Sequence, residues 1–487
     1  MPTLLERLGG REAITRGIVE QFCVLSRFPH PSHGEGRLGD FLQRRLEERG
    51  LEVRRDGTGN LLCLVSPSPG REGAPTLILQ GHLDMVCAFP PGSGLDPMEH
   101  VVAVEERDGF LRTDGRSSLG ADNCLGNAAV LWLLGRDVSH GPLRLLFTVA
   151  EEVGLEGAKQ VDPAWLAGAA YLINTDGFHL GRAIVGSASG RRETYTRPLE
   201  TCSPAPGGTW QLELSGCAGG HSGDDIHRGR ANPVKLLAHF LSNLSDAVNA
   251  QLAGLEGGTG HNVIPTWARA ELVCPPEGEA GLRAALEGFE ARLREQYAAT
   301  DPGLKVSLSP APPAGAVWAP ALAEGTLGLI NLLWDGVYAM HPAFPGVVGA
   351  SANVGRVTLE DGQVQVCAFV RCARQEEEDV LCARHAAAAA RAGFVRRASG
   401  YPGWPGTGEN TLARRMDRVF RAQTGRGLEI GAVHVGLEPS VFRAKQPGLI
   451  MVSTGPEILD AHSVDERAPL SGLADYALLL AGTMEAL

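Results

Sequence analysis

The sequence of 487 residues lacks the features that would place it in a membrane or on nucleic acid. No stretch approaches the about 18 consecutive apolar residues that a membrane-spanning helix needs, and the N-terminus has no long apolar core of the secretory type. The net charge is -12, from 44 basic and 56 acidic residues, which argues against a nucleic-acid partner or an anionic membrane. We therefore expect a soluble, cytoplasmic protein.

Paired cysteine motifs and phosphate-binding motifs are also missing. The ten cysteines are spread singly, and the nearest pair, Cys367 and Cys372, does not form a CxxC motif. Reduced thiols are therefore expected rather than a disulfide framework. The glycine-rich stretches 216–223 and 254–260 have neither a Walker lysine nor a strand-to-helix GxGxxG placement, which argues against a nucleotide-binding enzyme.

Histidine and carboxylate side chains are present in a specific pattern, because each follows an apolar, strand-like run or a glycine turn. Ligands gather at the carboxyl ends of strands in an open α/β sheet, so residues that follow strands can converge on one crevice. Imidazole and carboxylate ligands suit zinc, manganese or cobalt, and a carboxylate can bridge two ions about 3.5–4 Å apart. The pattern predicts a two-metal hydrolase. Its six residues are His82, Asp122, Glu151, Glu152, Asp176 and His462.

The adjacent residues Glu151 and Glu152 are expected to divide the work. Alternation at a strand end points neighbouring side chains different ways, so one can bind a metal while the other takes a proton from water. Asp84, two residues after His82, can orient that imidazole, because ligating histidines usually have such a partner. Each motif taken singly is most often an ordinary solvated strand end, but so many in one chain make coincidence a poor explanation.

The order and spacing of these motifs resemble the zinc dipeptidase and carboxypeptidase family, most closely its aminoacylhistidine (Xaa-His) dipeptidases. The similarity extends from about Phe28 to Glu466, nearly the full chain. It is carried by the segments His82-Leu-Asp84-Met-Val, Gly120-Ala-Asp122-Asn, Glu151-Glu152-Val-Gly, Asn174-Thr-Asp176, Gly219-Gly-His221-Ser-Gly and Gly455-Pro with His462-Ser-Val-Asp-Glu.

The resemblance implies two divalent metal ions, zinc first and manganese or cobalt as alternatives. In this assignment Glu151 is the general base and Asp84 orients His82. Asp122 bridges the two ions. The ligand sets are His82, Asp122 and Asp176 for one ion, and Asp122, Glu152 and His462 for the other.

Further functional roles are predicted for residues in a part of the chain with a different secondary-structure pattern. His221 lies between glycines that allow close approach to a substrate, and a histidine can donate to a developing oxyanion. The resemblance implies this role, served within one subunit or across a homodimer. Pro439-Ser440 stands where the Xaa-His branch has cysteine-glycine, which bears on substrate preference more than on chemistry. The expected substrate contacts are Asn262, Arg371, Gly436 and Glu438.

Cys124, two residues after Asp122, has two interpretations. It could be an additional thiolate ligand, but an inert residue at the start of the following helix is favoured. The related dipeptidases often have glycine here.

The chain is longer than one hydrophobic core usually serves, so two domains are expected. Residues 1–195 alternate helical and strand patterns, residues 196–398 follow a strand, helix, strand pattern, and residues 399–487 resume the first texture. Tyr401-Pro-Gly-Trp-Pro marks the return. The predicted fold is an α/β metallopeptidase core, with a mixed sheet flanked by helices, and an inserted α+β lid domain.

The sequence therefore predicts a metal-dependent dipeptidase that acts on small peptides, with Xaa-His dipeptides as the expected substrates. An amidohydrolase of N-acyl amino acids, or another small-peptide peptidase of the same fold, is the alternative within enzymes. A non-catalytic peptide- or metal-binding protein is the alternative of another class. A decayed site should have lost at least one of the six residues, and none is missing.

Overall fold

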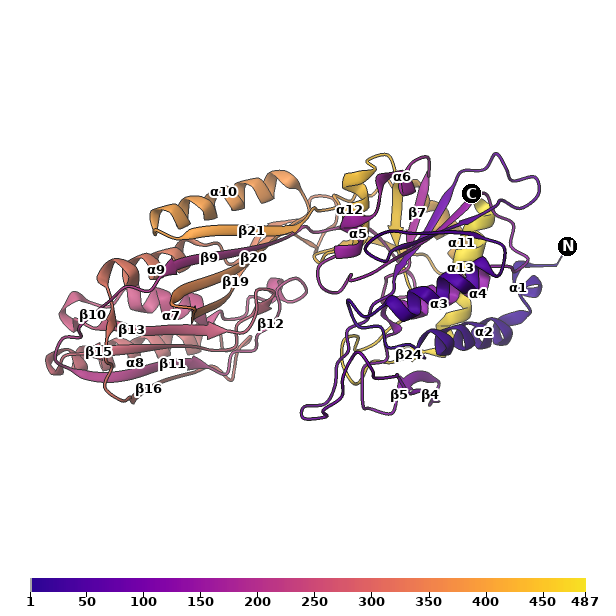
Figure 1. Ribbon diagram of the computed structural model, residues 1–487. Helices are drawn as coiled ribbons and strands as arrows, with labels where there is room; N and C mark the ends of the chain where they lie inside the picture. Colours follow the sequence, from indigo (N-terminus) through magenta and orange to yellow (C-terminus); the bar gives the residue numbers. More distant parts are fainter. Residues whose placement is uncertain (1) are drawn as a thin grey trace. The chain divides into compact units, whose positions relative to one another are not determined.

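A computed structural model describes residues 2–487, which form two compact units (Figure 1). Unit 1 contains the residues up to Ser187 together with Trp404–Ala432 and Leu437–Leu487, and unit 2 contains Ala188–Gly403 and Val433–Gly436. The segment predicted as the inserted lid, 196–398, lies within unit 2. Unit 2 begins before residue 196 and ends after residue 398. It also includes Val433–Gly436, although these residues follow later in the chain.

Unit 1 is built on an eight-stranded mixed sheet, which confirms the predicted α/β core. Its four central strands β6, β3, β7 and β23 are mutually parallel neighbours, and antiparallel strands flank them. In sheet order the strands are β1 (Glu52–Arg55), β2 (Leu61–Val65), β6 (Leu143–Thr148), β3 (Leu77–His82), β7 (Tyr171–Asn174), β23 (Ile450–Ser453), β8 (Arg182–Ser187) and β22 (Glu429–Val433).

Helix α4 (Ala121–Leu133) packs on β3 and also contacts α2 (Gly10–Leu25) and α13 (Leu473–Ala486). Every residue of α4 is buried, as expected for a helix that is apolar nearly all round. A Cβ atom at Gly17 would lie 1.8 Å from Trp132 Nε1, so glycine permits the close approach of α2 to α4. The remaining elements of unit 1 are α1 (Leu4–Arg7), α3 (Gly36–Glu47), β4 (Val104–Arg107), β5 (Phe110–Thr113), α5 (Glu156–Gln160), α6 (Pro163–Leu166), α11 (Thr411–Thr424), α12 (Glu438–Lys445), β24 (Ala468–Pro469) and a 3-10 turn at Leu470–Gly472.

Unit 2 is an antiparallel sheet with helices, in agreement with the predicted α+β character of the lid. In order along the sheet, the strands are β16 (Lys305–Pro310), β11 (Gly208–Ser215), β15 (Ala268–Cys274), β13 (Gln251–Gly258), β19 (Val348–Glu360), β20 (Gln363–Cys372), β9 (Gly190–Pro198) and β21 (Val395–Tyr401), with β18 (Gly336–Met340) also on β19. The other elements are β10 (Thr201–Cys202), β12 (Gly220–His221), α7 (Pro233–Ser242), β14 (Val263–Ile264), α8 (Pro276–Gln296), β17 (Val317–Trp318), α9 (Pro320–Leu332), α10 (Gln375–Arg391) and 3-10 turns at Ile226–Arg228 and Asp246–Val248.

Pairing within this sheet explains the extent of unit 2. Strand β9 pairs with β21 from Gly190 to Thr196, so both strands cross the predicted boundaries at 195 and 398. Helix α7 ends at Ser242, and a separate 3-10 turn follows at Asp246–Val248. The Ser245 hydroxyl accepts a hydrogen bond from Ala247 N and begins that turn instead of continuing the helix.

In residues 2–487 no helix has both the length and the apolar content needed to cross a bilayer.

Candidate metal centre

The carboxyl ends of the central strands of unit 1 bring the predicted ligands together. His82 is the last residue of β3, Asp176 lies two residues beyond β7, and Asp122 lies at the start of α4. Glu152 follows β6, and His462 follows β23 on a longer loop. Because β6, β3, β7 and β23 are parallel neighbours, these residues meet at one edge of the sheet.

Asp122 lies at the centre of this cluster and presents one carboxylate oxygen to each histidine. Its Oδ1 is 3.0 Å from His82 Nε2, and its Oδ2 is 2.9 Å from His462 Nε2. His82 Nε2 also lies 3.7 Å from Asp176 Oδ1, and His462 Nε2 lies 3.0 Å from Glu152 Oε1. The cluster thus contains three groups that could each hold a metal ion, and Asp122 belongs to two of them.

The ring orientation of His82 leaves Nε2 facing the carboxylates. Its Nδ1 is 3.0 Å from the backbone carbonyl oxygen of Asp84 and 3.5 Å from Asp84 Oδ1. A carbonyl can only accept, so Nδ1 carries the proton and donates it. Nε2 is then the ring nitrogen that faces the carboxylates, which is the ligating atom in histidines whose other nitrogen donates to a carbonyl or carboxylate.

Neighbouring charges and burial shift the pKa values of the groups in the cluster. Burial opposes ionisation, but hydrogen bonds from His462 and His82 hold the pKa of Asp122 well below its usual range. Burial alone would lower the pKa of His462, yet Asp122 and Glu152 raise it to about 11. Burial, together with the charges of Glu152 and Asp176, raises the pKa of Glu151 well above its ordinary value. The carboxylates therefore favour positive charge at this site.

The loop that carries Glu151 and Glu152 differs from the expected strand end. Strand β6 ends at Thr148, and Ala150 has a φ of 50°, so the alternation argument for the two glutamates does not apply. Atoms of both glutamates instead lie within 4.8 Å of a ring nitrogen of His82.

Side chains from distant parts of unit 1 hold four successive backbone N–H groups of this loop. Val149 N donates to Asn60 Oδ1 at 3.1 Å, and Ala150 N donates to Glu35 Oε1 at 2.8 Å. Glu151 N and Glu152 N donate to the two oxygens of Asp84, at 2.9 and 3.2 Å. Asp84 is fully buried. It contacts both the imidazole of His82 and the loop of the two glutamates. Glu35 and Asn60 were not among the site residues predicted from the sequence.

Cys124 is buried, and its Sγ lies 3.4 Å from His30 Nε2. Burial raises the pKa of its thiol to about 12, so the thiolate that a metal ligand needs is disfavoured. The inert interpretation of Cys124 is the one that this environment favours.

Three of the predicted residues of unit 2 lie close to one another. Strand β12 pairs with β14, with His221 opposite Val263, and Ser222 N donates to the backbone oxygen of Asn262 at 2.9 Å. His221 Nε2 lies 3.3 Å from Arg371 Nη2, and His221 Nδ1 lies 3.0 Å from Asp224 Oδ2. Arg371 is only 4% exposed, and its Nε is buried without a hydrogen-bond partner.

Gly436 belongs to the same unit and packs against Tyr401. A Cβ atom at this position would lie 2.4 Å from the Tyr401 hydroxyl, which in turn lies 3.4 Å from Arg371 Nη1. His434 is also near, with its Nε2 2.7 Å from Ser351 Oγ. Burial and the charge of Arg371 lower the pKa of His434 to about 3, so its imidazole is neutral. Neither Tyr401 nor His434 was predicted from the sequence as a site residue.

Glu438 differs from the other expected substrate contacts, because it belongs to unit 1 and is fully buried. Its Oε2 accepts hydrogen bonds from Gln80 and, at 2.9 Å, from Thr148 Oγ1. Burial raises its pKa to about 7. A contact with substrate would require its buried Oε1, which has no hydrogen-bond partner, to become uncovered.

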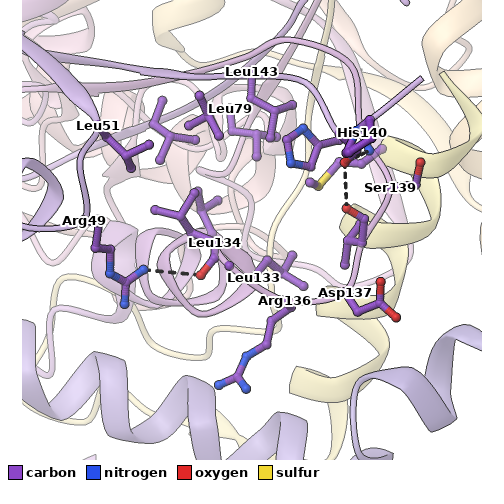
Figure 2. A pocket seen from close by; sticks show the side chains of 18 residues that line it. Arg49, Leu51, Leu79, Leu133, Leu134, Arg136, Asp137, Ser139, His140 and Leu143 are labelled. Atoms are coloured by element: carbon purple, nitrogen blue, oxygen red, sulfur yellow. Dashed lines mark hydrogen bonds between the residues drawn. The ribbon is translucent and has the colours of Figure 1, made fainter. Parts of the chain in front are cut away.

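A cavity of about 540 Å³ lies elsewhere in unit 1 (Figure 2). Leu79, Leu143 and Leu145 line it near the amino ends of β3 and β6, away from the ends that carry the ligands. Arg49, at its edge, donates to the Leu134 carbonyl. None of the predicted site residues lines this cavity.

Comparisons with known proteins agree with the resemblance seen in the sequence. Residues 212–301 match the model of the M20 peptidase dimerisation domain. The cytosol non-specific dipeptidase of Escherichia coli K12 is 31% identical, over 94% of this chain and 95% of that protein. The crystal structure of the aminoacylhistidine dipeptidase from Vibrio alginolyticus superposes with a TM-score of 0.86 at 29% identity, over 97% of this chain and 96% of that chain.

Human carnosine dipeptidase 1 shares the fold, with a TM-score of 0.54 at 13% identity over 99% of each chain. Similarity to the E. coli and Vibrio enzymes is stronger evidence of kinship, because their sequence identities of 31% and 29% extend over nearly the whole chain. The chain belongs to the M20 peptidase family, in the branch of the cytosol non-specific and aminoacylhistidine dipeptidases.

Proposed function

We propose that the protein is a two-metal dipeptidase. The observation that carries the proposal is the position of Asp122, whose two oxygens face two different histidine nitrogens at 3.0 and 2.9 Å. A carboxylate in this position can bridge two ions. The proposed ligands are His82, Asp122 and Asp176 for one ion, and Asp122, Glu152 and His462 for the other.

The residues fit a pair of divalent cations. Imidazole and carboxylate are ligands for zinc, manganese and cobalt, and we propose zinc as the first of the three. Glu152 Oε1 is buried and meets no partner other than His462 Nε2 at 3.0 Å, which can donate to it only when that nitrogen carries a hydrogen. Bound ions would supply Lewis acidity, which makes water nucleophilic near neutral pH and polarises the scissile carbonyl.

Glu151 is the proposed general base. It accepts the proton of the attacking water and then passes it to the leaving amine. Its backbone N–H is fixed by Asp84, so the same carboxylate positions both the base and His82.

Unit 2 supplies the remaining groups in this proposal. His221 donates to the oxyanion of the tetrahedral intermediate. Arg371 binds the C-terminal carboxylate of the substrate, because a guanidinium is suited to carboxylates and its Nη2 lies beside His221, 3.3 Å from Nε2. Asn262 and Gly436 contact the substrate beside these two residues. Catalysis in this proposal requires a His221 at the metal centre, either from the same subunit or from the partner in a homodimer.

A substrate panel tests this function. The protein loaded with zinc is expected to hydrolyse unmodified dipeptides, with Xaa-His dipeptides first, as in the name of the Vibrio relative. It should act poorly on the same dipeptides with an amidated C-terminus, because Arg371 would lose its anionic partner. Faster hydrolysis of N-acyl amino acids than of any dipeptide would favour the amidohydrolase alternative. A cytosolic location is part of the proposal, in line with the name of the E. coli relative.

Replacing His221 with alanine should lower the turnover number about 10²- to 10³-fold, the usual effect of losing one oxyanion donor. Metal content should not change, because His221 belongs to none of the groups that could hold a metal. Steady-state kinetics and metal analysis of the same preparation check both expectations. Wild-type activity of His221→Ala would contradict the oxyanion role and show that His221 is only a structural residue of a turn.

Mixing variants tests whether His221 acts across a dimer, which the match to a peptidase dimerisation domain makes worth asking. If it does, heterodimers of His221→Ala with Glu151→Gln should regain activity, because one of the two sites receives both an intact base and an intact histidine. Mixed dimers without rescue would place His221 in the site of its own subunit.

A further inference from the structure

Glu466 is a buried carboxylate that holds the backbone on which Asp122 sits. It is 2% exposed, and its two oxygens accept hydrogen bonds from four successive backbone N–H groups. Oε2 accepts from Leu119 N and Gly120 N, both at 2.9 Å. Oε1 accepts from Ala121 N at 2.9 Å and from Asp122 N at 3.4 Å.

These N–H groups lie at the start of α4, where a helix has no partners of its own for its first donors. Without Glu466, several buried donors would be left without an acceptor, which is unfavourable for each of them. The backbone of 119–122 could then relax only by moving, and Asp122 would move with it. The position of the Asp122 carboxylate thus depends on a side chain 344 residues later in the chain.

The same segment also carries His462, four residues before Glu466. His462 has a φ of 63° and Asp460 a φ of 52°, conformations that non-glycine residues adopt rarely and only when their surroundings hold them. Glu466 therefore ties the loop of His462 to the loop of Asp122. His462 Nε2 and Asp122 Oδ2, which lie 2.9 Å apart, belong to the two loops that Glu466 connects.

We propose that Glu466 is a positioning residue for the metal centre, whose carboxylate fixes Asp122 relative to His462 so that both ions can bind. The inference rests on the proposed function only in taking Asp122 and His462 as ligands. It predicts a loss of metal affinity without a direct part in the chemistry.

The experiment compares zinc binding to metal-free wild-type protein and to Glu466→Gln, by competition with a chromogenic chelator. Glutamine offers one acceptor oxygen, and its NH2 group would point at backbone N–H donors. The variant should bind zinc roughly 10- to 100-fold more weakly, the usual cost of losing a partner that orders metal ligands. At saturating zinc its turnover number should return to within a few-fold of wild type.

Glu457→Gln is the matched control. Glu457 lies in the same C-terminal segment and also accepts a backbone hydrogen bond, from Leu180 N at 3.0 Å, but it contacts none of the proposed ligands. This variant should bind zinc as the wild type does. If Glu466→Gln does not fold, Glu466→Asp keeps the charge on a side chain one methylene shorter and should show a smaller shift in the same direction.

Wild-type zinc affinity of Glu466→Gln, or a loss no larger than that of Glu457→Gln, would overturn the inference. So would a turnover number that stays low at saturating zinc, because that would place Glu466 in the chemistry itself. Binding is measured without substrate, so failure of the proposed dipeptidase activity would be seen separately.

Discussion

Replacing Glu151 with glutamine should lower the turnover number by roughly 10²- to 10⁴-fold, the usual contribution of a positioned general base. Glutamine keeps the shape of the side chain but cannot accept the proton of the attacking water. The metal content should stay at the wild-type value, because Glu151 is outside both proposed ligand sets. Steady-state kinetics and metal analysis on one preparation measure the two quantities together.

Glu152→Gln is the matched control, since it alters the neighbouring carboxylate in the same way. Its Oε1 lies 3.0 Å from His462 Nε2, so this variant should lose metal as well as activity. Near-normal turnover in Glu151→Gln would mean that another residue is the general base.

Replacing Asp122 with alanine should remove both metal ions at once. The two oxygens of Asp122 face both histidines, so this substitution takes one ligand from each proposed ion. His82→Ala and His462→Ala should each weaken mainly one ion, because each imidazole belongs to one of the two groups built around Asp122. Metal stoichiometry of the three purified variants measures the difference.

Asp122→Ala that still bound two ions tightly would rule out the bridging role. A common loss of all metal in the three variants would show instead that the two ions bind only together.

The convergence of the ligands could be predicted because it follows from sheet topology. Each of the runs before His82, Asp176 and Glu151 is a strand, and the strands are parallel neighbours, so residues that follow them share one edge. The reason given for the different roles of the two glutamates was wrong. Strand β6 ends at Thr148, and a loop held by Asp84, Glu35 and Asn60 sets their directions.

The groups that hold this loop and the Asp122 loop could not be predicted from the sequence. Glu35, Asn60 and Glu466 bind backbone N–H groups that lie 115, 89 and up to 347 residues away. A buried carboxylate that binds backbone donors has no distinctive spacing, and only tertiary packing brings its partners near.

Helix α8 shows the opposite case, in which the signal was present but unused. Its buried residues Leu282, Leu286, Phe289 and Leu293 repeat at helical spacing, and Phe289 stacks on Phe240 with ring centroids 4.6 Å apart. The extent of unit 2 was harder to predict, because it depends on the pairing of β9 with β21 across about 200 residues.

The cluster around Asp122 is proposed to make this protein a metal-dependent dipeptidase. Titration of the metal-free protein with zinc, while hydrolysis of an Xaa-His dipeptide is followed, tests the claim most directly. We expect no hydrolysis without metal, activity that rises until two ions are bound for each chain, and no comparable rise in Glu151→Gln. Equal hydrolysis by the metal-free protein, or two bound ions with no hydrolysis of any dipeptide, would contradict it.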